Sequence, residues 1–130
     1  CLIAPDGTGL LKLTEDVNGA SSYPSWTRDG RIVFMSNRDV DQTGRYSEIY
    51  IMDSDGENTR RLTSTRWDYN ANPAVSPIGD RIIYESDQDV DYGSELYVMN
   101  LDGSGNRRLT NDNAWNQNPT WAAPGSGARR

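Results

Sequence analysis

Residues 48–63 read EIYIMDSDGENTRRLT, and residues 95–110 read ELYVMNLDGSGNRRLT. Each stretch combines a run rich in β-branched and aromatic residues, an Asp-Gly pair and a closing Arg-Arg-Leu-Thr. Short apolar runs bounded by Asp-Gly predict two strands joined by a tight hairpin, because glycine adopts positive φ without steric cost. The two stretches therefore predict the same hairpin twice, 47 residues apart.

Three independent markers show that this hairpin belongs to a longer repeat. Asp-Gly occurs at 6–7, 55–56 and 102–103, Leu-Thr at 13–14, 62–63 and 109–110, and a proline with an apolar residue two positions later at Pro24, Pro73 and Pro119. Successive copies of each marker are 46 to 49 residues apart. Agreement between three unrelated markers establishes a fixed internal period.

Each complete period predicts four short strands. They are expected at residues 23–26, 31–36, 48–53 and 60–63 in the first unit, and at 72–75, 81–86, 95–100 and 107–110 in the second. The second and third strands are apolar on both faces, which fits sheets packed between neighbouring sheets. Four strands in such a period indicate the blades of a β-propeller. We therefore predict an all-β fold of four-stranded antiparallel blades.

The repeat also predicts how the chain divides. We expect one β-propeller segment over residues 1–130, with the end of a blade at 1–20, full blades at 21–67 and 68–113, and the first strand of a next blade at 114–130. A closed propeller needs about four to eight blades. The sequence therefore leaves two alternatives open: an excerpt of a longer protein, or copies that associate by strand complementation.

The repeat resembles a known family, the TolB-like (WD-repeat-like) propeller repeat. The matching residues are Pro24, Trp26, Asp29, Gly30, Ile32, Phe34, 36–39, 48–50, 52–56 and 60–63, and in the second unit 95–97 and 107–110. The resemblance implies the propeller fold, a periplasmic or extracellular location and a partner in the cell envelope. Such blades occur in adaptor proteins, in the non-catalytic part of oligopeptidases and in some lyases, so the fold does not name an activity.

Composition restricts the classes of partner. The 130 residues contain 13 Lys and Arg against 19 Asp and Glu, a formal net charge of -6. Nucleic acid and anionic lipid require a basic surface, so we expect neither as the main partner.

No apolar run approaches the roughly 18 residues that cross a bilayer, and no signal peptide is visible. Cys1 is the only cysteine, so no internal disulfide forms; lipidation of Cys1 is one interpretation and an arbitrary start of the chain is the other.

Catalysis is not predicted from this sequence. Histidine is absent, so these residues cannot build a Ser-His-Asp or Cys-His arrangement. Neither a Gly-x-Ser-x-Gly elbow nor a phosphate-binding loop occurs. We expect a non-enzymatic chain with no cofactor other than calcium.

Alternating carboxylates between the second and third strands are the candidate calcium ligands. They are Asp87, Asp89, Asp91 and Glu95 in the second unit and Asp39 and Asp41 in the first. Oxygen ligands around a tight turn suit Ca²⁺, although glycine and glutamate do not fall at the usual positions of a calcium loop. The alternative interpretation is structural: Asp39 and Asp89 cap turns, while Glu48 and Glu95 pair with arginines of nearby strands.

Aromatic residues in the connections between blades are the candidate partner-binding residues. They are Trp67, Tyr69 and Trp115. Exposed aromatic side chains make good anchors for a protein or glycan partner, and the alternative is ordinary packing between blades. Trp26 and Trp121 lie in first strands, and we expect them to pack between blades.

These observations favour a non-catalytic protein interaction or scaffold module whose partner is another protein or a second copy of the chain. Two alternatives remain open at this point. One is the substrate-screening propeller segment of a prolyl-oligopeptidase-like hydrolase. The other is a self-assembling structural subunit.

Overall fold

The computed structural model describes residues 13–14, 19–39, 46–65, 68–89, 93–112 and 114–122. Strands and turns make up these ranges, and none of their segments is a helix long and apolar enough to cross a membrane. The strands are β1 (Ser21–Trp26), β2 (Ile32–Ser36), β3 (Glu48–Met52), β4 (Arg60–Arg61), β5 (Asn70–Val75), β6 (Arg81–Ser86), β7 (Glu95–Asn100) and β8 (Arg107–Arg108).

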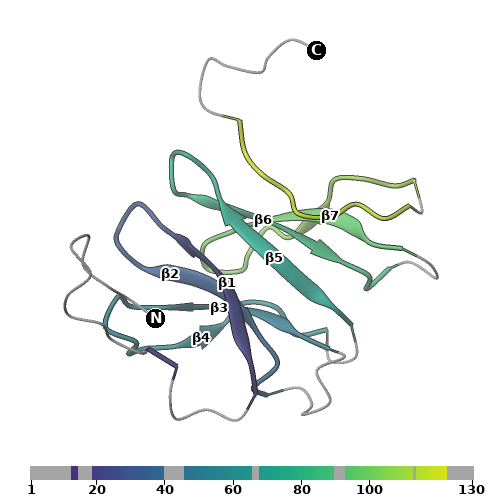
Figure 1. The fold of residues 1–130 in the computed structure, drawn as a ribbon. Helices are drawn as coiled ribbons and strands as arrows, with labels where there is room; N and C mark the ends of the chain where they lie inside the picture. Colours follow the sequence, from purple (N-terminus) through teal and green to yellow (C-terminus); the bar gives the residue numbers. More distant parts are fainter. Residues whose placement is uncertain are drawn as a thin grey trace.

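The strands form two sheets of identical topology. One contains β1-β2-β3-β4 and the other β5-β6-β7-β8, each in chain order and antiparallel throughout. Figure 1 shows the sheets side by side, with β5 next to the first sheet. Each predicted unit therefore forms one blade, and the predicted all-β propeller segment is confirmed.

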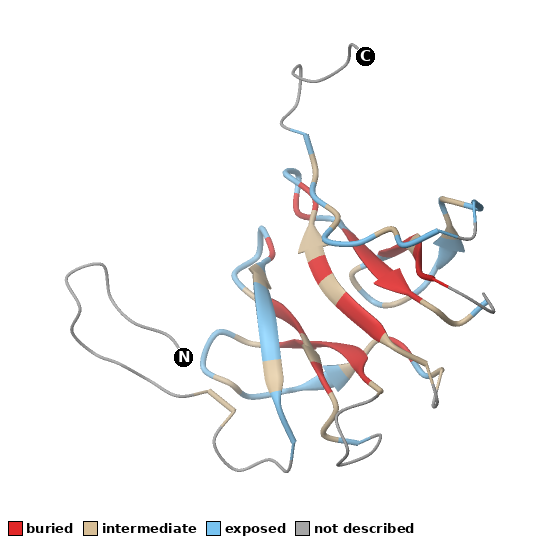
Figure 2. Ribbon diagram, turned by 45° about the vertical axis from the view of Figure 1, so that its right-hand side comes forward, coloured by how far each residue is buried: buried red, intermediate tan, exposed pale blue. Residues whose placement is uncertain are grey.

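The main core lies between the two sheets. It contains Val33, Ile49 and Ile51 of the first sheet and Ile82, Tyr84, Tyr97 and Met99 of the second, each at most 2% exposed. Burial of one such side chain stabilises the fold by about 1.5–3 kcal/mol. Figure 2 shows that the buried residues concentrate in the middle strands, whereas β1 is largely exposed. The two middle strands of each blade thus pack against the neighbouring blade, as the doubly apolar runs predicted.

The opposite face of the first sheet carries a second apolar cluster. Strand residues alternate between faces, so Ile32, Phe34, Tyr50 and Met52 point away from the second sheet. The ring centroids of Phe34 and Tyr50 are 5.7 Å apart in a stacked arrangement. Leu13 packs against this cluster, in the manner in which Leu62 packs against the main core.

The fourth strand of each blade is shorter than the sequence predicts. In the first blade β4 contains only Arg60 and Arg61, although the prediction extended to residue 63. The backbone amide of Leu62 still donates to the carbonyl of Ile49 at 2.7 Å, but the amide of Ile49 donates to the hydroxyl of Thr63 at 2.9 Å. The threonine side chain thus replaces the next backbone acceptor and ends the strand, and Leu96 and Thr110 repeat this arrangement.

The predicted Asp-Gly hairpins are present. Gly56 and Gly103 have φ of 89° and 87°, values that L side chains rarely adopt. Each glycine also lies close to the preceding blade: a Cβ at Gly103 would approach the carbonyl oxygen of Leu62 to 2.9 Å. Glycine is therefore required there both by the turn and by contact between blades.

Candidate functional site

One edge of both sheets collects the residues singled out from the sequence. In an antiparallel blade of this order, the loop between the second and third strands leaves from the same edge as the connection to the next blade. The acidic candidates lie in the former segment and the aromatic candidates in the latter. We call this edge, represented by Asp39, Tyr69, Asp87, Asp89 and Trp115, the loop edge.

Asp39 and Asp89 anchor the acidic loops through tyrosine hydroxyls. Tyr50 donates to Oδ2 of Asp39 at 2.9 Å, and Tyr97 donates to Oδ2 of Asp89 at 2.7 Å. Burial, followed by the hydrogen bond to the carboxylate, raises the pKa of both tyrosines above the ordinary value. Each carboxylate is thus bound to the strand that follows its loop, and its role as a turn cap stays a prediction.

Asp87 joins the acidic loop to the aromatic connection. Its Oδ1 accepts the backbone N–H of Tyr69 at 2.7 Å, and its own backbone amide donates to the carbonyl of Tyr69 at 3.3 Å. Residues that are 18 positions apart in the sequence are therefore held together. Sequence reasoning placed these two residues in separate candidate sites, and the structure makes them neighbours.

Glu48 and Glu95 are fully buried and bind arginine, as the structural alternative predicted. Each accepts hydrogen bonds from an arginine, a threonine hydroxyl, a backbone amide and an asparagine. These donors are Arg61, Thr63, Thr65 and Asn70 for Glu48, and Arg108, Thr110, Asp112 and Asn116 for Glu95. Because Asn70 begins β5, the Glu48 network fastens one blade to the next.

The calcium prediction is only partly covered by the structure. Asp41 and Asp91 lie outside the described residues, as do Trp67 and Cys1. Among the residues that are described, no three acidic, His or Cys side chains gather in a way that could hold a metal ion. The loop carboxylates Asp39, Asp87 and Asp89 have the partners given above, and calcium binding stays a prediction.

Tyr69 and Trp115 occupy equivalent positions on consecutive blades. Tyr69 forms an isolated parallel bridge with Ser47, and Trp115 forms the same bridge with Ser94. Trp115 is 62% exposed. The pKa of nearby Asp68 is raised, first by burial and then by the charges of Asp87, Glu48 and Asp89. The loop edge thus places an exposed Trp115 and a half-buried Tyr69 at a one-blade spacing on an acidic background.

The first strand of each blade, β1 or β5, carries a backbone feature that the sequence analysis missed, and the segment at Asn118 repeats it. Tyr23, Asn72 and Asn118, each followed by proline, have φ of 54°, 51° and 51°. In β1 and β5 this two-residue step forms the bulge where the pairing register shifts. Bulges re-aim side chains and are common beside functional sites. In the sequence, the recurring prolines were the signal for these bulges, because each one follows the residue with positive φ.

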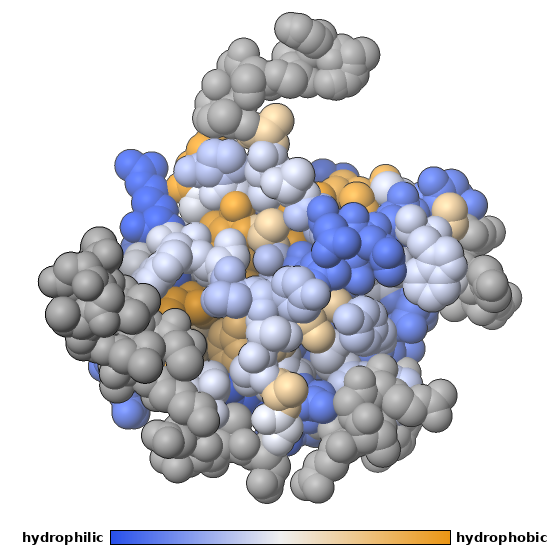
Figure 3. Space-filling model, viewed as in Figure 1, coloured by the Kyte–Doolittle hydropathy of each residue, from blue (hydrophilic) through white to orange (hydrophobic). Residues whose placement is uncertain are grey.

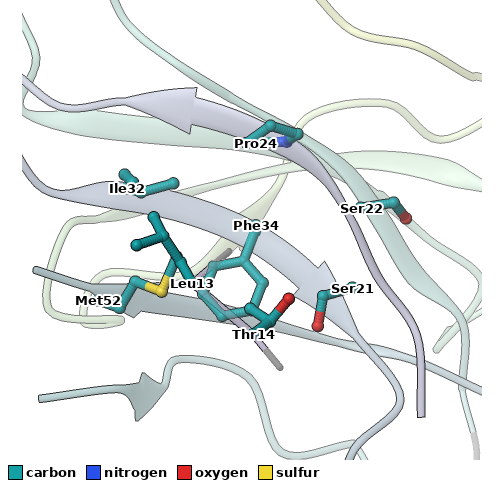
Figure 4. A pocket seen from close by; sticks show the side chains of 8 residues that line it. All are labelled: Leu13, Thr14, Ser21, Ser22, Pro24, Ile32, Phe34 and Met52. Atoms are coloured by element: carbon teal, nitrogen blue, oxygen red, sulfur yellow. The ribbon is translucent and has the colours of Figure 1, made fainter. Parts of the chain in front are cut away.

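Two hollows lie near these strands. A groove of about 160 Å³ is lined by Tyr23, Pro24, Asn72, Pro73, Asn118 and Pro119. A smaller hollow of about 90 Å³ lies over the second apolar cluster, where Figure 4 shows Leu13 beside Phe34 and Met52. The face seen in Figure 3 is of mixed polarity, with small apolar areas between polar side chains.

Trp26 and Trp121 differ in their surroundings. The indole N–H of Trp121 donates to the carbonyl of Ala74 at 2.9 Å and fastens its segment to β5, as expected for packing between blades. Trp26, at the equivalent position of β1, is 52% exposed. The difference arises because no sheet precedes the first one among the residues that the structure describes.

The repeat, the blades and their contacts agree with a family model described as the TolB beta propeller domain, which matches residues 3–128. The chain belongs to the TolB β-propeller family. Among curated protein sequences, none matches the chain.

Solved structures of TolB proteins share the fold. The putative TolB of Agrobacterium tumefaciens has a TM-score of 0.58 at 28% identity, over 72% of this chain and 34% of its own. TolB of Acinetobacter baumannii has a TM-score of 0.57 at 24% identity, over 80% of this chain and 24% of its own. The chain therefore spans about a quarter to a third of the TolB structures that it matches.

An enzyme shares the same fold at lower identity. A structure titled as an oligogalacturonate lyase in complex with manganese has a TM-score of 0.55 at 18% identity, over 70% of this chain and 24% of its own. Such a likeness shows the TolB-type propeller fold alone. Activity must instead be argued from the side chains of this chain.

Proposed function

We propose that this TolB-type propeller segment is a non-catalytic recognition module that binds a protein partner at its loop edge. The observation that carries the proposal is the equivalent placement of Tyr69 and Trp115 on consecutive blades. Aromatic side chains supply much of the binding energy at protein interfaces. Two anchors one blade apart on a rigid frame suit a partner that spans both blades.

The hydrogen bonds of the loop edge support this function, because they hold its backbone in place before a partner arrives. Asp87 fixes Tyr69 by two hydrogen bonds, and the tyrosine hydroxyls of β3 and β7 fix Asp39 and Asp89. A surface that is already ordered loses less conformational entropy on binding. Following the family resemblance, we place the module outside the cytoplasm, with a partner in the cell envelope.

The proposal is tested by introducing a photo-crosslinking amino acid at Trp115 in producing cells. Asn58, an exposed residue in the β3–β4 turn at the opposite edge of the blade, is the matched control position. We expect a discrete crosslinked protein of different mass from position 115 and none from position 58. Equal patterns from both positions would contradict a partner at the loop edge.

A crosslink to a second copy of the chain would instead support the self-assembling alternative. Mass spectrometry of the crosslinked band separates the two results, because a homodimer yields peptides of this chain alone.

Calcium binding is a separate proposal for the same edge. Titration calorimetry with Ca²⁺, with Asp89→Asn as the comparison, tests it: heat that disappears in the variant supports the site, and no heat with the unmodified chain rejects it.

A further inference from the structure

The groove lined by Tyr23, Asn72 and Asn118 has features that the proposed partner binding at the loop edge does not explain. Strands β1 and β5 and the segment at Asn118 each contribute a residue with positive φ followed by proline. Positive φ before proline is rare and costs about 1–3 kcal/mol for a residue such as tyrosine. Strained positions of this kind are retained where surrounding structure enforces them, and here they form the wall of one groove of about 160 Å³.

Asn72 brings an unsatisfied acceptor to this groove. Its Oδ1 atom is buried and has no hydrogen-bond partner in the structure. A buried polar atom left without a partner costs about 1–3 kcal/mol. Asn72 lines the groove, so a hydrogen-bond donor in the groove satisfies this oxygen once the side-chain amide turns toward it.

Glu85 is a buried carboxylate that is hydrogen-bonded to Asn118, one of the residues lining the groove. It is 2% exposed, and its Oε2 accepts the backbone N–H of Asn118 at 2.8 Å. Within the described ranges no arginine or lysine pairs with it, in contrast to Glu48 and Glu95. The equivalent position of the first blade is Met35, so the repeat does not require a carboxylate there. A buried carboxylate without a cation is unfavourable unless a ligand supplies the charge.

Two tyrosines complete the surroundings. Tyr23 lines the groove and is 54% exposed. Burial raises the pKa of Tyr69, and the charges of Glu85 and Tyr23 raise it further. Aromatic faces attract cations, most strongly where water is excluded. The groove is therefore lined by the Tyr23 ring and by Asn72 and Asn118, and the buried Glu85 carboxylate is hydrogen-bonded to the backbone of Asn118. A negative charge behind the wall and an aromatic ring on it both favour a positively charged donor.

We propose that this groove binds the cationic side chain of an arginine or lysine on the partner protein. The groove volume of about 160 Å³ exceeds the roughly 10–15 Å³ that one water needs on the same measure, so the groove has room for a long side chain. The net charge of -6 favours the approach of a basic segment. The inference rests on the proposed function, since it names the chemistry by which the same partner protein would contact the groove.

The test is a nuclear magnetic resonance titration of the ¹⁵N-labelled chain with N-acetyl-arginine amide. N-acetyl-citrulline amide is the matched probe, because it has nearly the same shape without the charge. We expect saturable shifts at the Asn72 side-chain amide and at the backbone of Tyr23 and Asn118. Citrulline should bind at least about tenfold more weakly, the loss expected when the donor is no longer charged.

Two variants remove the groups that the proposal uses. Glu85→Gln removes the charge and keeps an acceptor for the Asn118 amide, and Asn72→Gly removes Oδ1 while allowing the positive φ. Each should weaken arginine binding at least about fivefold. Asn58→Gly is the control, because Asn58 has φ of 53° in an exposed turn away from the groove. Unchanged backbone spectra elsewhere show that each variant is folded.

Three results would overturn the proposal: no saturable shifts at the groove, equal binding of both probes, or unchanged binding in Glu85→Gln. The first indicates that ordered water alone satisfies Asn72. This failure is distinguishable from that of the proposed function. A crosslink from position 115 that persists while the groove takes no arginine would sink only the inference about the cation.

Discussion

Nη2 of Arg61 lies 2.8 Å from Oε1 of Glu48, a carboxylate with 0% side-chain exposure. Arg108 and Glu95 repeat this contact at 2.8 Å in the second blade. Because Asn70 of the following blade donates to the same carboxylate of Glu48 at 3.1 Å, the ion pair is part of the joint between blades.

Removal of the charge at Glu48 should therefore destabilise the fold. Glu48→Gln leaves the half-buried Arg61 without its partner and replaces an acceptor with a donor facing Thr63 and Asn70. We expect a loss of about 3 kcal/mol in the free energy of unfolding, as for other broken buried pairs. Urea denaturation measures the loss. Glu57→Gln, on an exposed turn residue, is the control and should change stability by less than about 0.5 kcal/mol; equal effects of the two substitutions would show that the pair is unimportant.

The equivalent turn glycines Gly30 and Gly79 allow backbone strain to be separated from contact between blades. Both have φ of 86°. A Cβ at Gly30 meets nothing within 4 Å, whereas one at Gly79 would lie 2.3 Å from Cβ and 2.7 Å from the backbone N of Arg28. Gly30→Ala should cost about 1–2 kcal/mol, the strain of a left-handed conformation. Gly79→Ala should cost about 1–3 kcal/mol more because the turns of the two blades must separate.

Denaturation of the two variants under identical conditions gives the comparison. Equal losses would mean that the contact between the two turns relaxes without cost. A larger loss for Gly30→Ala would contradict the placement of the second blade against the first.

The tyrosines predict loss of stability at alkaline pH. Burial raises the pKa of Tyr84 from 10.0 to about 12, and burial with a carboxylate neighbour raises the pKa of Tyr50 and Tyr97 further. A folded-state pKa above the unfolded value means that folding favours the neutral phenol. The corresponding stability is fully present below pH 10 and is lost as the pH rises through the folded-state value.

Urea denaturation at increasing pH measures this loss. Tyr84→Phe should reduce the pH dependence between about 10 and 12, because its phenol no longer titrates. Phenolate absorbance that develops at the same pH in the folded and the urea-unfolded chain would contradict the buried state of these tyrosines.

Local pattern was sufficient to predict the strands and turns of this chain. The alternation of apolar runs with Asp-Gly pairs located β2, β3, β6 and β7, since both features act over a few residues. The prediction failed at the ends of β4 and β8. There Thr63 and Thr110 replace a backbone acceptor with a hydroxyl, and no short-range pattern distinguishes this from continued pairing.

The candidate site was predicted in its residues but not in its arrangement. Tyr69 and Trp115 were identified from their aromatic character and their position between blades. The contact between Tyr69 and Asp87 was not foreseen, because it depends on where one blade connection passes the next loop. Glu85 gave no signal at all, since a glutamate in a strand is indistinguishable from an exposed one until its neighbours are known.

The amino-acid sequence by itself determined the repeat, the all-β blades and the turns, because hydrophobic periodicity and glycine conformation are properties of adjacent residues. Only the tertiary structure decided that Glu48 binds Asn70 of the next blade and that the buried Glu85 accepts the backbone N–H of Asn118. These relationships arise where one sheet packs against the part of the chain that follows it, which brings together residues 22 and 33 positions apart.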